Sequence, residues 1–308
     1  MEKSAPAIFL VHTDLDGVCS AAIAKRIYNG NVRIYFAGPR TLVSALKKIR
    51  FCKTLGIVDV ALNHSDAPLV VKELERLKSS SCEIIWIDHH EWLPEDIETV
   101  SKLVNLILER SPSAASILYR KFAYTDEVSK KIAEIADDGD SNKNELEYTL
   151  AYKIGTRNNA DRNKLIEMFY KGEFYNQEVE RWKKQLEEEN RIIEELIKKA
   201  KSYFSASGYR ISFVDVRGFT IIGSLLAKKL QQLGSNIVFI LYSNTSGVLY
   251  GDGKVNLLEI ATKYNGGGHP NACGVNFKLS LFDKLFIRLY KKKLPGMAKK
   301  LLADLKFL

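Results

Sequence analysis

Histidines and aspartates provide the clearest chemical signal in this sequence. They gather in three places, each directly after an apolar run: His12–Gly17, which reads His-Thr-Asp-Leu-Asp-Gly, the single residue Asp59, and Asp88–His90. Carboxylates that lie close together raise each other's pKa unless a cation neutralises them. A set that mixes carboxylates with imidazoles favours Mn²⁺, Mg²⁺ or Fe²⁺ over the metals that prefer thiolates. If the fold brings these places together, we expect a site for divalent cations.

The elements around these residues predict that they meet. Short apolar runs, expected to be strands, alternate with amphipathic runs, expected to be helices. The expected strands are Ala7–Val11, Val32–Phe36, Thr54–Val60 and Cys82–Ile87, and the expected helices are Gly17–Tyr28, Thr41–Ile49 and Ala67–Leu77. This alternation predicts an α/β fold with a mostly parallel sheet and helices on both faces. Ligands bind outside the carboxyl ends of such strands, so we expect Asp14, Asp16, Asp59 and Asp88 to converge there with two or three imidazoles.

The remainder of the chain predicts a long helix and a second, smaller α/β domain. Phe174–Phe204 is dense in Glu and Lys and carries a partial apolar stripe, which indicates one long linker helix. A coiled-coil arm of a homodimer is the alternative. Beyond it, strands are expected at Tyr209–Val216, Ile237–Tyr242, Gly247–Tyr250 and near Gly274–Phe277, with helices at Ile222–Leu233 and Leu257–Tyr264. The expected domains are 1–172 and 207–308, joined by a helical linker over 173–206.

Composition narrows the class of protein. The chain has 308 residues, of which 46% are hydrophobic and 27% charged, and this excludes a disordered or collagen-like protein. Its four cysteines are far apart and form no CxxC pair, which argues against a disulfide scaffold or structural zinc site and favours a reducing compartment. The only apolar run near the start, Ala7–Val11, is too short for a signal peptide or a membrane span. We therefore expect a cytoplasmic protein with no membrane partner.

Basic residues concentrate near the end of the sequence. Lys278–Leu308 holds nine Lys or Arg residues and two Asp residues, in a chain with 46 basic and 37 acidic residues. Such a patch attracts polyanions by counterion release. A solvated amphipathic helix explains the same pattern equally well.

A glycine cluster supplies a second candidate site. Gly266, Gly267 and Gly268 precede His269, and successive glycines let the backbone approach a ligand closely and present N–H groups to an oxyanion. A glycine run is more often only a turn. Opposite a metal site, however, it is expected to grip a phosphate or sugar, with Asn265 and Asn271 assisting.

These motifs together resemble a known family. His12-x-Asp14-x-Asp16-Gly17, Asp59 and Asp88-His89-His90 resemble the signature of the DHH phosphoesterases, and Gly266–Gly274 resembles the GGGHxxAxG motif of their DHH-associated C-terminal domain. The resemblance covers nearly the whole chain, with the catalytic domain at 1–172 and the substrate-binding domain at 207–308. It implies a dinuclear centre, usually of Mn²⁺, although Mg²⁺ is possible. RecJ-type single-strand exonucleases, nanoRNA and pAp phosphatases, and cyclic-dinucleotide phosphodiesterases belong to this family.

The resemblance also implies which residues hold the metals. One metal would be held by His12, Asp14 and Asp59, and the other by Asp16, a bridging Asp59, His89 and a later aspartate. The later ligand is expected within Ile135–Asp140, an acidic turn that could equally be a plain solvated loop. Asp137 fits best by spacing, and Asp138 is the alternative.

The other motif residues receive different roles. Asp88 is expected to orient an imidazole and His90 to face the scissile phosphate. The resemblance places substrate contacts at Gly266, Gly267, Gly268, His269 and Asn271. His64 does not fit the metal scheme and is expected to cap a helix or lie at the cleft rim.

The substrate is expected to be short. Many family members carry a Ser-x-Arg element where this chain has Gly247–Gly253, which contains no arginine; Tyr250 is a candidate to stack a base instead. The expected function is metal-dependent hydrolysis of short single-stranded oligonucleotides, RNA or DNA, to mononucleotides. One alternative is a cyclic-dinucleotide or pAp phosphodiesterase or phosphatase. A catalytically inactive replication scaffold is an alternative of another class.

Overall fold

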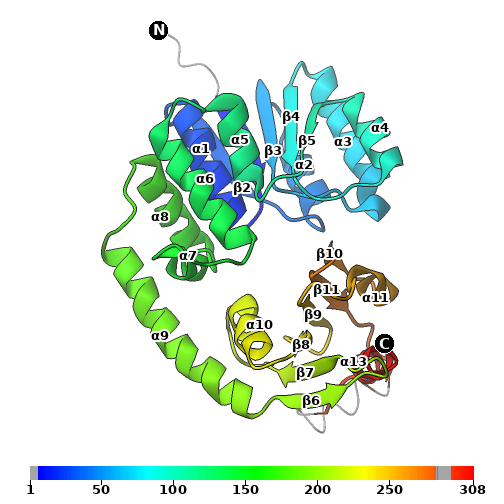
Figure 1. The fold of residues 1–308 in the computed structure, drawn as a ribbon. Helices are drawn as coiled ribbons and strands as arrows, with labels where there is room; N and C mark the ends of the chain where they lie inside the picture. The colour runs from blue at the N-terminus through cyan, green and yellow to red at the C-terminus, as the bar shows by residue number, and fades with distance from the viewer. Residues whose placement is uncertain (1–5, 282, 284–292) are drawn as a thin grey trace. The chain divides into compact units, whose positions relative to one another are not determined.

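The computed structural model describes residues 6–281, 283 and 293–308 (Figure 1). The chain forms two compact units, Met1–Leu186 and Glu187–Leu308. Both units are α/β, as the sequence predicts.

A parallel sheet forms the centre of the first unit. Its five strands are β1 (Ala7–Val11), β2 (Val32–Phe36), β3 (Thr54–Val58), β4 (Glu83–Asp88) and β5 (Asn105–Leu108). They lie in the order β2-β1-β3-β4-β5, with Leu10 opposite Ile57 and Ile57 opposite Trp86. The first four strands confirm the sequence prediction. The fifth strand was not predicted. It has only four residues, which are too few to show the alternation of apolar and polar side chains that marks a strand.

Helices cover both faces of this sheet (Figure 1). On one face, leucines of α2 and α3 pack on Leu10, Ile57 and Trp86 in a single apolar core. On the other face, α1 packs against α5, α6 and α8. The helices of this unit are α1 (Leu15–Ile27), α2 (Leu42–Lys48), η1 (His64–Asp66), α3 (Ala67–Ser79), α4 (Pro94–Ser101), α5 (Ala114–Phe122), α6 (Glu127–Asp140), α7 (Thr149–Gly155) and α8 (Asn159–Tyr170).

Helix α9 (Gln177–Lys198) contributes to both units. Trp182 is fully buried in its first half, and Ile193 and Leu196 of its second half pack into a core of the second unit. Three of the apolar side chains that a coiled-coil arm would use, Trp182, Ile193 and Leu196, are therefore buried within the chain. The sequence predicted helix as far as Phe204, but the chain leaves the helix at Lys199 and forms β6 (Lys201–Phe204).

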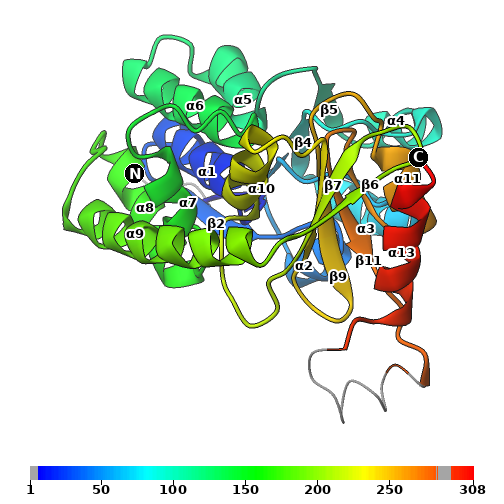
Figure 2. The ribbon, with the colours of Figure 1, turned by 60° about the horizontal axis from the view of Figure 1, so that its bottom comes forward.

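The second unit is built on a mixed sheet. Its strand order is β10-β11-β9-β8-β7-β6, and β7 and β8 are parallel whereas the other described pairs are antiparallel. Helix α10 lies on one face, and α11 and α13 pack on the other (Figure 2). The elements are β7 (Arg210–Asp215), α10 (Gly223–Gln232), β8 (Ile237–Leu241), β9 (Ser246–Gly251), α11 (Leu258–Lys263), β10 (Gly267–His269), β11 (Ala272–Asn276) and α13 (Gly296–Lys306).

The basic C-terminal segment is described only in part. Helix α13 buries Ala298, Leu301, Leu302 and Leu305, as the amphipathic interpretation predicts. Four of the nine basic residues lie outside the described residues: Lys284, Arg288, Lys291 and Lys292.

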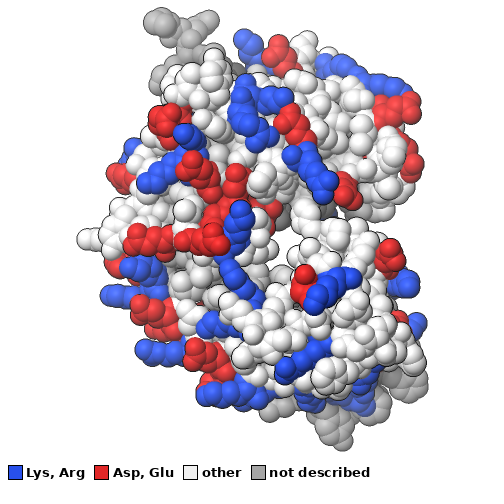
Figure 3. Space-filling model, in the orientation of Figure 1, with Lys and Arg blue, Asp and Glu red and all other residues white. Residues whose placement is uncertain are grey.

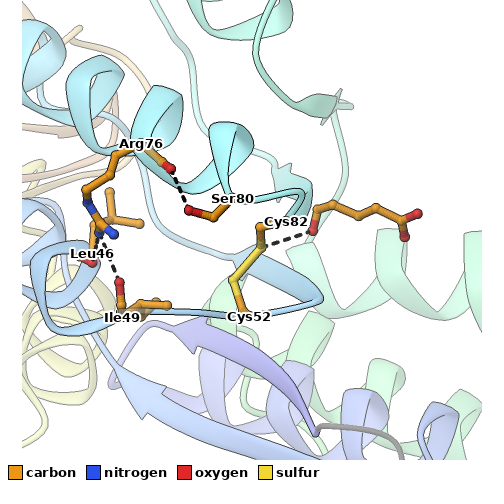
Figure 4. The surroundings of a disulfide bond; sticks show 7 residues. Leu46, Ile49, Cys52, Arg76, Ser80 and Cys82 are labelled. Carbon is orange, nitrogen blue, oxygen red and sulfur yellow. Dashed lines mark hydrogen bonds between the residues drawn. A yellow bond between two sulfur atoms is a disulfide. The ribbon is translucent and has the colours of Figure 1, made fainter.

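A disulfide joins Cys52 to Cys82, with Cα atoms 5.5 Å apart (Figure 4). The two cysteines precede β3 and β4, and because these strands are parallel neighbours, their starts lie together. Next to the disulfide, the Arg76 guanidinium donates to the carbonyl oxygens of Leu46 and Ile49, both at 3.0 Å. The prediction of reduced cysteines is thus wrong for this pair. The sequence did not show the pairing, because the two cysteines are 30 residues apart. Cys19 and Cys273 are buried free thiols.

Among the described helices, each is too short or too polar to cross a bilayer.

Candidate metal centre

The candidate metal ligands of the first unit lie at one edge of its sheet, where three adjacent strands end. His12 and Asp14 follow β1, Asp59 follows β3, and Asp88 ends β4. Asp59 adopts a left-handed backbone conformation, with φ of 60°, and its N–H donates to the Ile87 carbonyl at 3.0 Å. Such a conformation in a residue other than glycine is costly and is concentrated at functional sites. It turns the chain sharply after β3 and leaves the Asp59 side chain at the strand end.

His89 is oriented toward three carboxylates. Its Nδ1 lies 3.1 Å from the Ser111 carbonyl oxygen, so Nδ1–H donates there and the Nε2 lone pair is directed inward. Nε2 lies 3.8 Å from Asp16 Oδ2, 3.7 Å from Asp59 Oδ1 and 3.7 Å from Asp140 Oδ2. These distances are too long for hydrogen bonds and suit ligands that share one cation.

The Asp16 carboxylate is held by the start of helix α5. Its two oxygens accept the backbone N–H groups of Ala114 and Ala115 at 2.7 and 2.9 Å, and the residue is 1% exposed. A helix N-terminus stabilises negative charge. The other lone pairs of this carboxylate remain available toward His89.

A second group of donors lies beside the first. His12 Nδ1 is 2.8 Å from Asp14 Oδ2 and 3.9 Å from Asp59 Oδ2. Asp14 also caps helix α1, because its Oδ1 accepts the Gly17 N–H at 3.1 Å. Position 17 must be glycine here, since a Cβ would lie 2.2 Å from the His12 carbonyl oxygen. Asp59 belongs to both groups of donors, which is the arrangement that two neighbouring cations require.

Asp88 supports the site from behind. It is fully buried, and its two oxygens accept hydrogen bonds from His90 Nδ1 at 2.7 Å and Trp92 Nε1 at 2.8 Å. Burial opposes the charged form of His90, but the hydrogen bond and charge of Asp88 outweigh it and raise the pKa of His90 to about 9. His90 therefore carries a positive charge at neutral pH in this arrangement.

The acidic segment Ile135–Asp140 brings Asp140 to the cluster, not Asp137 or Asp138 as the sequence predicts. Asp137 accepts hydrogen bonds from the hydroxyls of Ser113 and Ser116 at 2.5 and 2.7 Å. Asp138 points elsewhere and holds the loop before α7 through Thr149 Oγ1 at 2.6 Å and two backbone N–H groups. Only Asp140 of the three aspartates approaches His89. The segment is the last turn of α6, not a loop, so successive aspartates point in different directions.

Helix α6 reaches this position because it packs closely on α1. A Cβ at Gly139 would lie 2.7 Å from Leu15 Cδ2. The glycine thus permits the close approach that carries Asp140 to the site.

Burial, followed by repulsion between neighbouring carboxylates, has the largest effect on the pKa values of the cluster. Burial and neighbouring carboxylates raise the pKa of Asp16 and of Asp59 well above the usual range, and burial and Asp14 raise that of Asp140. Burial also acts on Asp14, but the charge and hydrogen bond of His12 outweigh it and lower its pKa. A bound cation would favour the ionised form of each carboxylate and so oppose the rise in the pKa of Asp16, Asp59 and Asp140.

The residues present fit divalent cations. Asp59 Oδ2 is buried, and no donor in the described part of the chain bonds to it. Carboxylates with neutral imidazoles and no thiolate suit Mn²⁺ or Mg²⁺. The donor atoms of His12, Asp14 and Asp59 lie within 4.8 Å of one another.

One arginine at this edge was not found from the sequence. Arg162 of α8 donates from Nε to the Thr13 carbonyl at 2.8 Å, and its guanidinium lies 5.2 Å from the Phe36 ring centre. No motif marks it, because it comes from a helix far along the chain. His64 is exposed and instead pairs with the buried Asp96, 3.1 Å from its Nδ1, and it makes no capping hydrogen bond.

The glycine motif of the second unit forms an edge strand, not a loop. Gly267 and Gly268 pair with Gly274 and Cys273 through β10 and β11, with Gly266 just before them. His269 and Asn271 are exposed at the end and turn of this hairpin. Tyr250 is half-buried against the core beside α10.

Comparison with known proteins agrees with this geometry. Residues 7–139 match the family model described as DHH family, N-terminal domain. No curated protein matches the chain.

Solved structures share the fold at low sequence identity. A pGpG-specific phosphodiesterase, PggH of Vibrio cholerae, is 16% identical with a TM-score of 0.59, covering 97% of this chain and 99% of its own. The DHH domain of a protein titled as a member of a family of ribosomal proteins is 16% identical with a TM-score of 0.68, covering 97% and 85%. Exonuclease RecJ bound to manganese is 13% identical with a TM-score of 0.59, covering 96% and 93%.

The first unit is therefore an α/β domain whose strand ends carry a cluster of carboxylate and imidazole side chains that could hold metal ions. Residues 7–139 are a DHH-family N-terminal domain.

Proposed function

We propose that this protein is a metal-dependent phosphodiesterase that hydrolyses short single-stranded oligonucleotides to mononucleotides. The observation that supports it most is the direction of His89 Nε2, which faces Asp16, Asp59 and Asp140 while Ser111 holds the opposite ring nitrogen. A shared cation explains this arrangement, because it removes the repulsion among the carboxylates.

Two sets of residues would hold the cations. His12, Asp14 and Asp59 form one set, and Asp16, Asp59, His89 and Asp140 form the other. Asp140 here replaces Asp137 because of its distance to His89. Bound Mn²⁺ or Mg²⁺ would supply charge for the phosphoryl oxygens and lower the pKa of an attacking water.

The remaining residues act on the phosphate. His90, kept protonated by Asp88, donates a hydrogen bond toward the scissile phosphate. Arg162 adds positive charge at the same edge, in a chain that has no arginine in Gly247–Gly253. Gly266, Gly267, Gly268, His269 and Asn271 remain our proposed substrate-binding residues.

A phosphodiesterase for dinucleotides is the second candidate. PggH, a relative by fold, is titled as specific for pGpG. Cyclic dinucleotides and pAp are further candidate substrates, and an inactive scaffold is the candidate of another class. We also propose a cytoplasmic location, although a disulfide such as Cys52–Cys82 is more usual in oxidising compartments.

Hydrolysis by the wild-type protein and by Asp59→Asn tests the proposal. Substrates are oligonucleotides of increasing length, pGpG, a cyclic dinucleotide and pAp, each with Mn²⁺ and with chelator. We expect Mn²⁺-dependent release of mononucleotides, fastest from short strands, and a loss of at least about 100-fold in Asp59→Asn because both sets lose a ligand.

The control is Asp66→Asn, which removes a carboxylate from η1 outside the cluster. Wild-type activity in Asp59→Asn would refute the metal assignment. No hydrolysis of any substrate by a protein that binds Mn²⁺ would favour the scaffold.

A further inference from the structure

A groove lies along the free edge of the first sheet. Strand β2 ends the strand order, and beside it a cavity of about 800 Å³ extends between β2, α2 and the start of α8. Ile8 and Ile49 are buried at its base, whereas the residues at its rim are exposed.

The groove is basic. Arg33, Lys48 and Arg50 line it, all three are exposed, and none of its described lining residues is acidic. The sequence explains this, because residues 17–58 contain eight Lys or Arg residues and no Asp or Glu. Of these cations, Lys25 and Arg26 form ion pairs with Glu167 and Asp126. The three groove cations form no ion pair with any described residue, so their charge faces solvent.

This distribution differs from that along helix α9. In Figure 3, basic side chains along α9 alternate with acidic ones. Several of them pair, as Lys183 does with Glu180 and Lys198 with Glu195. The groove instead carries basic side chains without acidic neighbours among its lining residues, and such a strip attracts a polyanion.

Aromatic rings stand among the cations. Tyr35 is 46% exposed and Phe51 is 66% exposed, and both line the groove. Tyr35 and Arg33 share one face of β2, since they are two residues apart. Exposed rings interleaved with cations form the surface on which unpaired bases stack while the backbone phosphates are neutralised.

The rim is held in place. Phe51 adjoins Cys52, whose disulfide fixes it to Cys82, and Arg76 holds the carbonyls of Leu46 and Ile49 (Figure 4). A fixed surface loses less conformational entropy on binding.

One end of the groove lies near the metal centre. Phe36 lines the groove, and the guanidinium of Arg162 lies over its ring. Arg162 also donates to the carbonyl oxygen of Thr13, the residue between the candidate ligands His12 and Asp14. A strand bound in the groove could therefore lead to the strand ends of the same unit.

We propose that this groove is a binding site for single-stranded nucleic acid, separate from the metal centre. Arg33, Lys48 and Arg50 bind phosphates, and Tyr35 and Phe51 stack bases. Binding there needs no metal, so it is tested independently of hydrolysis.

The experiment measures fluorescence anisotropy of a labelled oligothymidylate of about 15 nucleotides with the full chain in EDTA. We expect Arg33→Gln/Lys48→Gln/Arg50→Gln to bind at least about tenfold more weakly and to lower the salt slope by about 2, because each lost phosphate contact removes about 0.7. The matched control, Lys72→Gln/Lys102→Gln/Lys130→Gln, removes the same charge from α3, the end of α4 and α6.

Stacking is tested separately. Tyr35→Ala/Phe51→Ala is expected to weaken binding about tenfold, whereas Tyr124→Ala/Phe204→Ala, a pair that is 70% and 69% exposed elsewhere, is expected to leave it unchanged. Because binding is measured in EDTA, failure of the hydrolysis proposal would leave this one standing.

Three results would overturn the proposal. The first is equal affinity of the groove variant and its charge-matched control. The second is equal affinity for a polyglutamate peptide and the oligothymidylate, which would indicate an acidic protein partner. The third is a change of oligomeric mass in Tyr35→Ala/Phe51→Ala on sedimentation, which would indicate a second copy on this edge.

Discussion

Asp59 and His89 occupy conformations that are explained only by what they face. Asp59 has a positive φ, and His89 directs a lone pair at three carboxylates. At the scale of single residues, the site depends on hydrogen bonds that come from elsewhere in the chain: the Ser111 carbonyl, the N–H groups that start α5, and the Asp88 carboxylate. These partners fix where each ligand points before a cation binds.

The ligand role of Asp140 gives the first prediction at this scale. Asp140→Asn should weaken Mn²⁺ binding by at least about tenfold, because it removes a donor 3.7 Å from His89 Nε2. Asp137→Asn is the matched control and should change affinity by less than about threefold, since its carboxylate is bonded to two serine hydroxyls. Calorimetric titration with Mn²⁺ measures both. The opposite ranking would return the ligand role to Asp137.

The sequence reached most of this site and missed part of it for a physical reason. His12, Asp14, Asp16, Asp59 and His89 follow strand ends, and strand ends in a parallel sheet share an edge. Asp140 lies in the last turn of helix α6, a segment for which the sequence predicts a loop. The direction of each aspartate side chain there is set by its position around the helix, which a loop prediction does not provide. Arg162 reaches the site through tertiary packing alone, and no local pattern marks such a residue.

At the scale of elements, α1 and α6 are joined by a charged pair at the start of α6. Arg26 of α1 bonds to Asp126, the N-cap of α6, through Nε at 2.5 Å and Nη2 at 2.8 Å. This hydrogen bond, together with Ser129 and against the effect of burial, lowers the pKa of Asp126 to about 2.

This pair predicts a pH dependence of stability. The folded pKa is below the unfolded one, so the carboxylate stabilises the fold above about pH 4 and loses that effect as pH falls toward 2. Asp126→Asn should therefore lower the free energy of unfolding by about 1 kcal/mol at pH 7 and by much less near pH 2. Urea titrations at both pH values measure it, with Glu75→Gln on α3 as the control. An equal deficit at both pH values would show that lost packing, not charge, is responsible.

The elements themselves were largely predictable. Strands β1 to β4 are mostly apolar runs bounded by turn residues, which is a strong local signal. Predictions failed where the residues themselves show no strand pattern. β5 has only four residues, β6 continues the polar sequence of α9, and β10 consists of glycines and a histidine. Pairing with β4, β7 and β11 makes these segments strands, and pairing partners are invisible in a local pattern.

At the scale of the whole molecule, the disulfide is the feature with the largest expected effect on stability. It closes a loop with a sequence separation of 30 residues, and such a cross-link typically contributes about 2–4 kcal/mol. Adding a reductant should lower the free energy of unfolding of the wild-type protein by about that amount. The same reductant should not affect Cys52→Ser/Cys82→Ser. Calorimetry with thiol counting by mass spectrometry measures both, and a wild-type transition insensitive to reductant would contradict the prediction.

The disulfide has a consequence for how strands β3 and β4 can separate. It joins the two strands where they begin, and Asp59 and His89 follow the same strands where they finish. Separation of the strands can therefore start only from the end that carries the ligands. A cation bound between Asp59 and His89 would hold that end too. An oxidant, which forms the disulfide, would therefore stabilise the pairing of β3 with β4, whereas a chelator, which removes the cation, would weaken it.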